Sequence, residues 1–216
     1  MSYVRHGITK FVRANKEIIV SAGAINSPQL LLLSGIGPKR HLSTIGIKCR
    51  VNLPVGQNLQ DHVGTLIGPI TVEGGQAFMM DRNISLSAVT DYIYNGAGPM
   101  AFVPVSVTGK MSSSFAHPYW PDLFVHQFAA APHYGSGPLV RVVEDIIGLK
   151  RNLLASYVEP TEGKDAYFNF LCVGRPHSRG QVTLRSNDPF AKPLIDPQYY
   201  SDPRDVDIMV EGTLVD

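Results

Sequence analysis

The chain has 216 residues, of which 44% are hydrophobic and 17% charged, and its 19 basic and 18 acidic side chains give a net charge of +1. This length can bury a core in one large domain or two small ones. The near-neutral balance, without a basic run, gives no electrostatic support to nucleic-acid binding. Two cysteines, Cys49 and Cys172, supply neither a disulfide framework nor a CxxC metal motif.

The N-terminal segment predicts two short strands, residues 3–8 and 16–22. The second contains Ile18-Ile19-Val20, a continuous apolar run typical of a strand buried on both faces. No charged residue stands between Glu17 and Lys39, and so long an uncharged stretch first suggests a membrane span. We reject the span because Ser27-Pro28 starts a helix inside the stretch and glycines end it about two turns later. We infer a buried strand, a turn and a short buried helix.

The helix in this stretch is expected to follow a turn at Gly23-Ala24. Ser27 is predicted to be its N-cap and Pro28 its first helical residue. Leu30 to Leu33 form its body, and a pair of glycines followed by proline ends it.

The middle of the chain predicts a short strand at residues 49–54, which leads into a glycine turn. Residues 99–117 are small, apolar and rich in serine, and they predict a loop. Between these segments, residues 84–95 fit a helix whose apolar face carries Leu86, Val89, Tyr92 and Ile93.

The second half predicts strands at residues 123–131 and 167–174, both rich in Phe and Val, and a shorter strand at 182–184. A helix is expected around residues 142–155. The last helix is expected to begin at Pro203, and because its pattern continues to the final residue without a C-cap, we expect a truncated chain.

Three patterns that suggest chemistry fail in their context. Residues 96–101 match GxGxxA as a string, but a predicted helix precedes them and none follows, so we reject a phosphate loop. Asp122, His126 and His133 lack the spacing of metal ligands, so we predict no metal site. GxSxG does not occur, so an acyl-transfer triad is not supported.

Two segments keep both a functional and a structural interpretation. The strand, glycine and Ser-Pro helix start in residues 17–37 could bring backbone N–H groups to an anionic ligand, or could form only a buried βα unit. Asn58, Asp61 and His62 could line a cofactor pocket, or could bond within their own loop.

A family resemblance rests on four segments. Residues 23–37, GAINSPQLLLLSGIG, resemble the second signature of the glucose–methanol–choline (GMC) oxidoreductases at every constrained position. Residues 53–62 are similar to the family segment that follows the signature, and residues 177–212 resemble the opening of the family's C-terminal region. Residues 119–128 are similar to insect members of the glucose dehydrogenase type.

The resemblance implies an FAD-dependent oxidoreductase that acts on the CH–OH group of a small-molecule alcohol or sugar and passes a hydride to the flavin. The implied fold class is α/β, or α+β overall. Residues 1–62 would be the C-terminal part of a Rossmann-like FAD-binding domain, and residues 63–216 an incomplete substrate-binding domain with an antiparallel sheet and helices. The resemblance also implies that six residues lie close to the cofactor: Ala22, Gly23, Ser27, Asn58, Asp61 and His62.

Two parts of the family pattern have no match in this chain. The GxGxxG loop that holds the pyrophosphate and the catalytic histidine are both missing, so we name no catalytic residue and expect an interior fragment. Such a fragment is expected to bind FAD weakly or not at all. The alternative function is a non-catalytic truncated product or a binding remnant. No signal peptide is recognised in the first residues, and the compartment, the substrate and the electron acceptor stay open.

Overall fold

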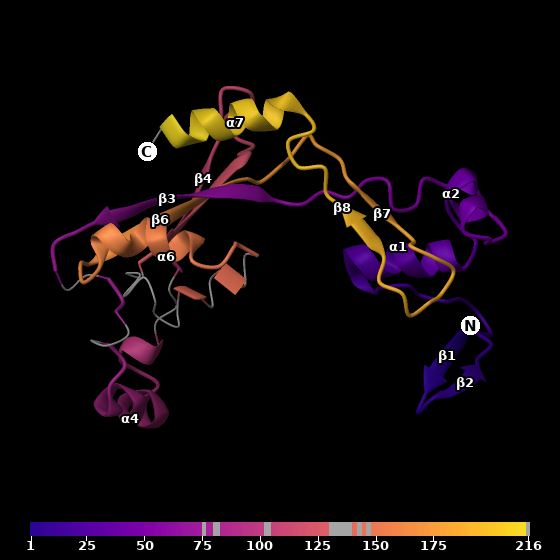
Figure 1. The fold of residues 1–216 in the computed structure, drawn as a ribbon, viewed down its shortest axis with the longest axis horizontal. Helices are drawn as coiled ribbons and strands as arrows, with labels where there is room; N and C mark the ends of the chain where they lie inside the picture. The colour runs from indigo at the N-terminus through magenta and orange to yellow at the C-terminus, as the bar shows by residue number, and fades with distance from the viewer. Residues whose placement is uncertain are drawn as a thin grey trace. The chain divides into compact units, whose positions relative to one another are not determined.

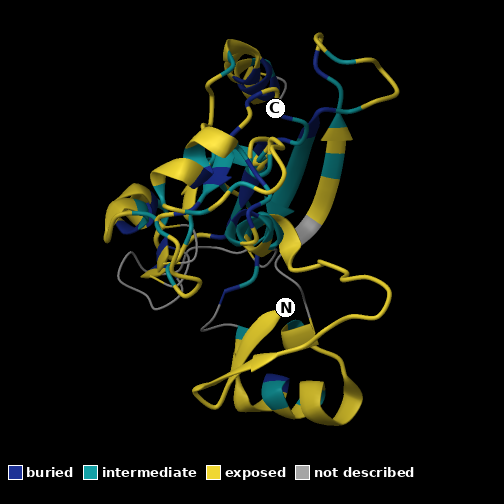
Figure 2. Cartoon of the chain, turned by 90° about the vertical axis from the view of Figure 1, so that its right-hand side faces the viewer, coloured by how far each residue is buried: buried dark blue, intermediate teal, exposed yellow. Residues whose placement is uncertain are grey.

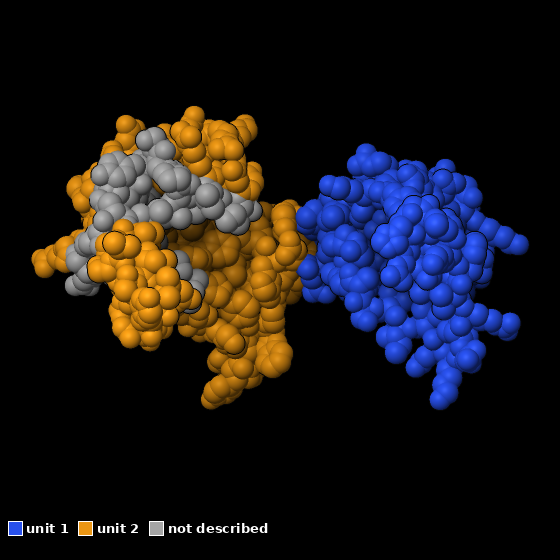
Figure 3. Space-filling model, turned by 90° about the horizontal axis from the view of Figure 1, so that it is seen from below, with its two compact units in different colours: residues 1–60, 179–198 blue, residues 61–178, 199–216 orange. Residues whose placement is uncertain are grey.

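A computed structural model describes residues 1–74, 77–79, 83–101, 105–129, 140–141, 144–145 and 148–214 (Figure 1). The chain forms two compact units (Figure 3). Unit 1 contains residues 1–60 and 179–198, and unit 2 contains residues 61–178 and 199–216. In the described part of the chain, no helix is long and apolar enough to cross a membrane.

Unit 1 contains two antiparallel strand pairs and two helices. Its first pair is β1 (Ser2–Arg5) with β2 (Ile8–Phe11), and its second is β7 (Gln181–Thr183) with β8 (Leu194–Asp196). The helices are α1 (Gly23–Leu33), which lies against β7, and α2 (Lys39–Thr44). The small core of the unit is formed by the buried side chains Leu32, Leu42 and Leu184.

The predicted strand at residues 16–22 is wrong. These residues form neither strand nor helix up to Ala22, and the side chain of Ile19 is 78% exposed (Figure 2). A strand needs neighbours that pair its N–H and C=O groups. Among the described residues no strand lies beside this segment, so its apolar run stays in an irregular, exposed conformation.

Unit 2 is built on a four-stranded antiparallel sheet with the strand order β3-β6-β5-β4. β6 lies in the middle, where Leu171 pairs with Thr65 on one side and with Val125 on the other. The sheet confirms the predicted combination of an antiparallel sheet with helices. Its strands are β3 (Val63–Thr71), β4 (Val105–Met111), β5 (Leu123–Phe128) and β6 (Ala166–Val173).

Helices cover both faces of this sheet (Figure 1). The C-terminal helix α7 (Pro203–Leu214) lies on one face and buries Ile208 and Met209 against sheet residues that include Leu123, Leu171 and Val173. On the other face, α6 (Leu153–Val158) packs Ala155 and Val158 near Phe168. Alternate residues of each strand point to opposite faces, and this alternation supplies the two apolar clusters.

The predicted helix at residues 84–95 is confirmed as α4 (Leu86–Asn95). The Ser85 side chain accepts a hydrogen bond from the Ala88 N–H, and Gly96 ends the helix with φ of 62°. On its apolar face Leu86 and Ile93 are exposed, and Ala88 is the buried residue of the helix. Residues 96–101 continue from this helix into the short 3₁₀ helix η1 (Pro99–Ala101), which is not the setting of a phosphate loop.

Some of the remaining predictions of strands, loops and helices are confirmed and others are wrong. Strands at residues 123–128 and 166–173, the strand β7 and the helix α7 are confirmed. The predicted loop at 99–117 instead contains β4. Residues 49–54 contribute only a bridge from Val51 to Ile36. His133 and parts of the predicted helix at 142–155 lie outside the described residues.

Candidate cofactor site

Helix α1 begins at Gly23, five residues earlier than predicted, so Ser27 is not its N-cap. Gly23 has a φ of 83°, a conformation that favours glycine, and it turns the chain directly into the helix. Ser27 lies in the second turn, where its Oγ accepts a hydrogen bond of 3.0 Å from the Ala22 N–H. In the described structure no side chain caps this helix and no acidic residue lies in its first turn. Its first N–H groups are therefore available to an external acceptor.

Pro28 lies inside α1 and changes the same end of the helix. Because proline has no N–H group, the Ala24 carbonyl cannot receive the usual helical hydrogen bond from residue 28. Ala24 and Pro28 both line a pocket in unit 1. The start of α1 therefore presents backbone polar groups beside a concave surface.

The loop at residues 54–60 forms the opposite wall of this pocket. The Gly56 carbonyl accepts a hydrogen bond of 2.7 Å from the Val182 N–H, and Gly56 has a φ of 79°. A Cβ at position 56 would lie 2.1 Å from the Val182 carbonyl oxygen. Leu59 and Gly180 exchange two backbone hydrogen bonds of 3.0 and 2.8 Å. The loop therefore packs directly against the start of β7. At position 56, where the two backbones come closest, only glycine fits.

The pocket has a volume of about 380 Å³, which lies within the usual range for small-molecule sites. No charged residue is among the described residues that line it, and its polar side chains are amides. An uncharged ring or a sugar hydroxyl group suits such a lining better than an ionised group does. The lining residues are Ala24, Pro28, Pro54, Gly56, Gln57, Asn58, Leu59, Gln60 and Val182.

Asp61 and His62 belong to unit 2, where their side chains contact neighbouring residues of that unit. The Asp61 carboxylate accepts hydrogen bonds from the His62 N–H at 2.9 Å and from the Tyr199 hydroxyl. This hydrogen bond to Asp61, together with burial, raises the pKa of Tyr199 to about 12. The His62 ring contacts Phe124 edge to face, with ring centroids 5.9 Å apart. Both carboxylate oxygens of Asp61 are therefore already engaged.

The structure thus brings together part of the predicted site. Asn58 is the one predicted residue that lines the pocket among the described residues, and Gly23 and Ser27 lie beside its α1 wall. The amides of Gln57 and Gln60 were missed, although they stand next to Asn58 in the sequence. Val182 was also missed, and no local pattern signals its approach to Gly56.

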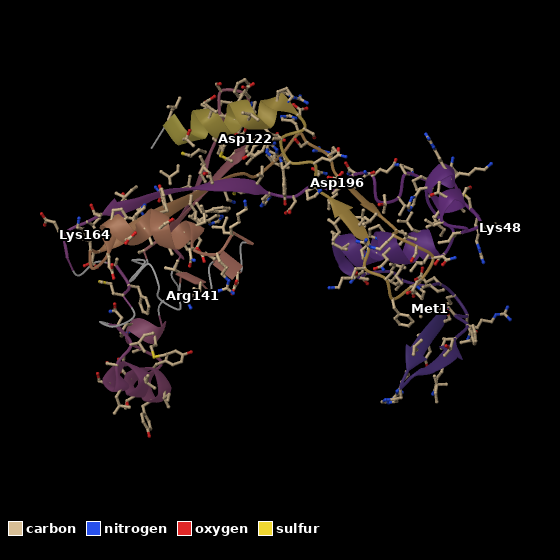
Figure 4. All side chains as sticks on the ribbon, in the orientation of Figure 1. Met1, Lys48, Asp122, Arg141, Lys164 and Asp196 are labelled. Atoms are coloured by element: carbon tan, nitrogen blue, oxygen red, sulfur yellow. The ribbon has the colours of Figure 1, made fainter. Side chains whose placement is uncertain are left out.

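Asp122 and His126 contact neighbouring serine and threonine side chains, and His133 lies outside the described residues. Asp122, labelled in Figure 4, is buried and accepts hydrogen bonds from the Ser113 N–H and Oγ at 2.9 and 2.7 Å. The His126 Nδ1 lies 3.2 Å from the Thr108 hydroxyl. In the described part of the chain, no group of three or more His, Cys, Asp or Glu side chains could hold a metal ion.

Comparison with known proteins supports the sequence resemblance. The N-terminal family model described as GMC oxidoreductase matches residues 1–64, and the C-terminal model of the same description matches residues 176–215. The chain belongs to the GMC oxidoreductase family. The matches include the 54–60 loop of the pocket and helix α7, which lie far apart in the sequence.

Curated relatives from the GMC family are moderately similar to the chain. Versicolorin B synthase of Aspergillus parasiticus is 33% identical over 203 residues, which cover 92% of this chain and 30% of the relative. Glucose dehydrogenase [FAD, quinone] of Drosophila pseudoobscura pseudoobscura is 34% identical over 209 residues, with 95% and 30% coverage. The chain spans about a third of the length of the relatives it matches.

Solved structures lead to the same fold. A formate oxidase of Aspergillus oryzae, studied for FAD modification, matches with a TM-score of 0.69 and 25% identity. The match covers 94% of this chain and 36% of that protein. The α/β fold class is therefore confirmed, while the Rossmann-like arrangement of residues 1–62 stays a prediction.

Proposed function

We propose that this chain is part of an FAD-dependent oxidoreductase that acts on the CH–OH group of an alcohol or a sugar. The observation that supports it is the amide-lined pocket beside the start of α1, in a chain that belongs to the GMC family. When bound, the flavin would accept the hydride that the substrate carbon gives up. The residues of this chain would bind and orient the cofactor.

We assign residues 1–62 to the FAD-binding domain and residues 63–216 to the substrate-binding domain. Within the second range, residues 179–198 pack in unit 1 and supply Val182 to the pocket. Asn58 and its neighbouring amides would hold an uncharged part of the nucleotide in the pocket. The uncapped N–H groups at Gly23 and Ala24 would favour its phosphates. With a volume of about 380 Å³, the pocket would hold only part of the cofactor, in line with the weak binding expected of this chain.

The test is a titration of the purified chain into FAD, followed by flavin fluorescence. We expect a saturable change in flavin fluorescence that reports weak binding. Asn58→Ala should lower the affinity for FAD about tenfold, since a lost hydrogen bond in a binding site costs about 1.5 kcal/mol. Asn95→Ala, at the end of α4 in the other unit, is the matched control and should leave the titration unchanged.

The same samples separate the enzyme from the binding remnant. Anaerobic addition of alcohol and sugar donors should bleach the absorbance of bound flavin if the chain is catalytically competent. Bound flavin that no donor bleaches would support the binding remnant. If FAD causes no saturable change, or if Asn58→Ala binds like the unmodified chain, the assignment of the pocket is wrong.

A further inference from the structure

The loop between β4 and β5, residues 112–121, presents three aromatic side chains to solvent. Phe115 is 58% exposed, Tyr119 89% and Trp120 63%. Large aromatic side chains usually contribute to cores or interfaces because each can bury an extensive apolar area. An exposed cluster of them on one loop indicates a surface that binds something.

The backbone of this loop is held firmly at its N-terminal side. The Ser113 N–H and hydroxyl donate to the buried Asp122 carboxylate. The Ser114 N–H and hydroxyl donate to the two carboxylate oxygens of Glu211 on α7, each at 2.6 Å. The two serines thus fix the loop both to the start of β5 and to the helix that covers the sheet.

Its C-terminal side is held by Arg175. The Arg175 Nε–H donates to the Pro121 carbonyl at 2.9 Å, and a second guanidinium N–H donates to the Trp120 carbonyl. The guanidinium carbon also lies 5.3 Å from the centre of the Trp120 ring, a cation–π distance. The aromatic rings are therefore displayed on an ordered frame, which lowers the entropy that a ligand must overcome.

We propose that this loop is a binding platform for a neutral saccharide, separate from the cofactor pocket. A sugar ring has apolar C–H faces that can stack on Tyr119 and Trp120, and hydroxyl groups for the polar atoms of the loop, among them the Tyr119 hydroxyl. Residues 112–121 contain no Asp, Glu, Lys or Arg, which suits an uncharged ligand.

The composition of the loop and of its contacts also weighs against a membrane surface as the ligand. A membrane-binding surface usually adds a cluster of Lys and Arg for anionic lipids. Among the described residues, Arg175 is the one cationic side chain that makes a hydrogen bond or a cation–π contact with this loop. A stacked, uncharged ring is the ligand that remains best matched.

The experiment uses the full chain, because Trp120 is its single tryptophan and reports directly from the platform. Trp emission and acrylamide quenching are followed during titration with cellohexaose, laminarihexaose and chitohexaose. We expect at least one of them to cause a saturable blue shift and to protect Trp120 from acrylamide. Tyr119→Ala should weaken that binding about tenfold, the usual loss for one aromatic contact.

Controls separate stacking from other effects. Tyr94→Ala removes a similarly exposed ring from α4 and should bind as the unmodified chain does. Sorbitol, which carries hydroxyl groups but no ring, should cause no shift. The proposal is overturned if none of the three sugars shifts the emission, if Tyr119→Ala binds normally, if sorbitol acts equally, or if only phosphatidylcholine vesicles produce the shift. None of these readings depends on flavin.

Discussion

The substitution Gly56→Ala tests how the wall of the pocket is built. Gly56 has a φ of 79°, and an added Cβ would lie 2.1 Å from the Val182 carbonyl oxygen. The matched control is Gly46→Ala, since Gly46 has a φ of 72° but its nearest neighbour, the Asn187 Nδ2, would lie 3.9 Å from the new Cβ. Both substitutions strain the backbone, and only the first creates a clash.

The expected magnitudes follow from these distances. A left-handed conformation costs a non-glycine residue about 1 to 2 kcal/mol, and this cost applies to both variants. At position 56 the loop must also move away from Val182, which loses a backbone hydrogen bond worth about 1 kcal/mol. Relief of the overlap adds about 1 to 3 kcal/mol more. We therefore expect about 3 to 6 kcal/mol for Gly56→Ala and about 1 to 2 kcal/mol for Gly46→Ala.

Amide hydrogen exchange is the suitable assay, because two units need not unfold as one transition. The Val182 N–H, which bonds to Gly56, should exchange roughly a hundredfold faster in Gly56→Ala than in Gly46→Ala. FAD binding should weaken in the first variant only. Equal exchange of the Val182 amide in both variants would refute the close approach as the reason for glycine at position 56.

Two further predictions concern unit 2. Asp205→Ala removes the buried carboxylate that accepts hydrogen bonds from the His177 N–H at 2.7 Å and the Ser178 N–H at 2.8 Å, so urea unfolding followed by Trp120 fluorescence should show a loss of about 3 kcal/mol; an unchanged midpoint would contradict this role. Tyr199 has a folded pKa of about 12 against an ordinary value of 10.0, so it contributes stability that is complete below pH 10.0 and is lost as the pH rises through 12. Thermal unfolding of Tyr199→Phe should therefore fall less steeply over this range than that of the unmodified chain, and parallel curves would exclude the Asp61 hydrogen bond as the cause.

Sequence patterns predicted the elements whose signals are local. Helix α7 was predictable because Pro203 sets its start and its apolar residues recur at helical spacing. β5 and β6 were predictable from their Phe and Val content. β4 was predicted as a loop although Val105, Val107 and Met111 alternate as in a strand, because the segment around it is rich in serine and small residues.

Errors arose where the outcome depends on residues distant in sequence. The apolar run at Ile18 to Val20 predicts a buried strand, but burial requires a paired neighbour, and no described strand supplies one. Serine is a preferred N-cap residue, which is why Ser27 was predicted to start the helix. Gly23 can turn the chain into the helix earlier because its positive φ is unstrained. The pairing of Gly56 with Val182 joins segments that no local pattern connects.

The chemistry of the pocket indicates which part of a nucleotide each wall can hold. Its amides can bond to a ring or a ribose hydroxyl, but in the described lining no cation is present to balance a phosphate. The start of α1 supplies the complementary group, because its first N–H groups have no side-chain cap and Ser27 bonds back to Ala22. If the proposed site is right, Asn58→Ala should weaken binding of FAD and of riboflavin or adenosine, whichever part binds here. Added inorganic phosphate should compete with FAD equally well in both proteins, since it would occupy the α1 start and not the amide pocket.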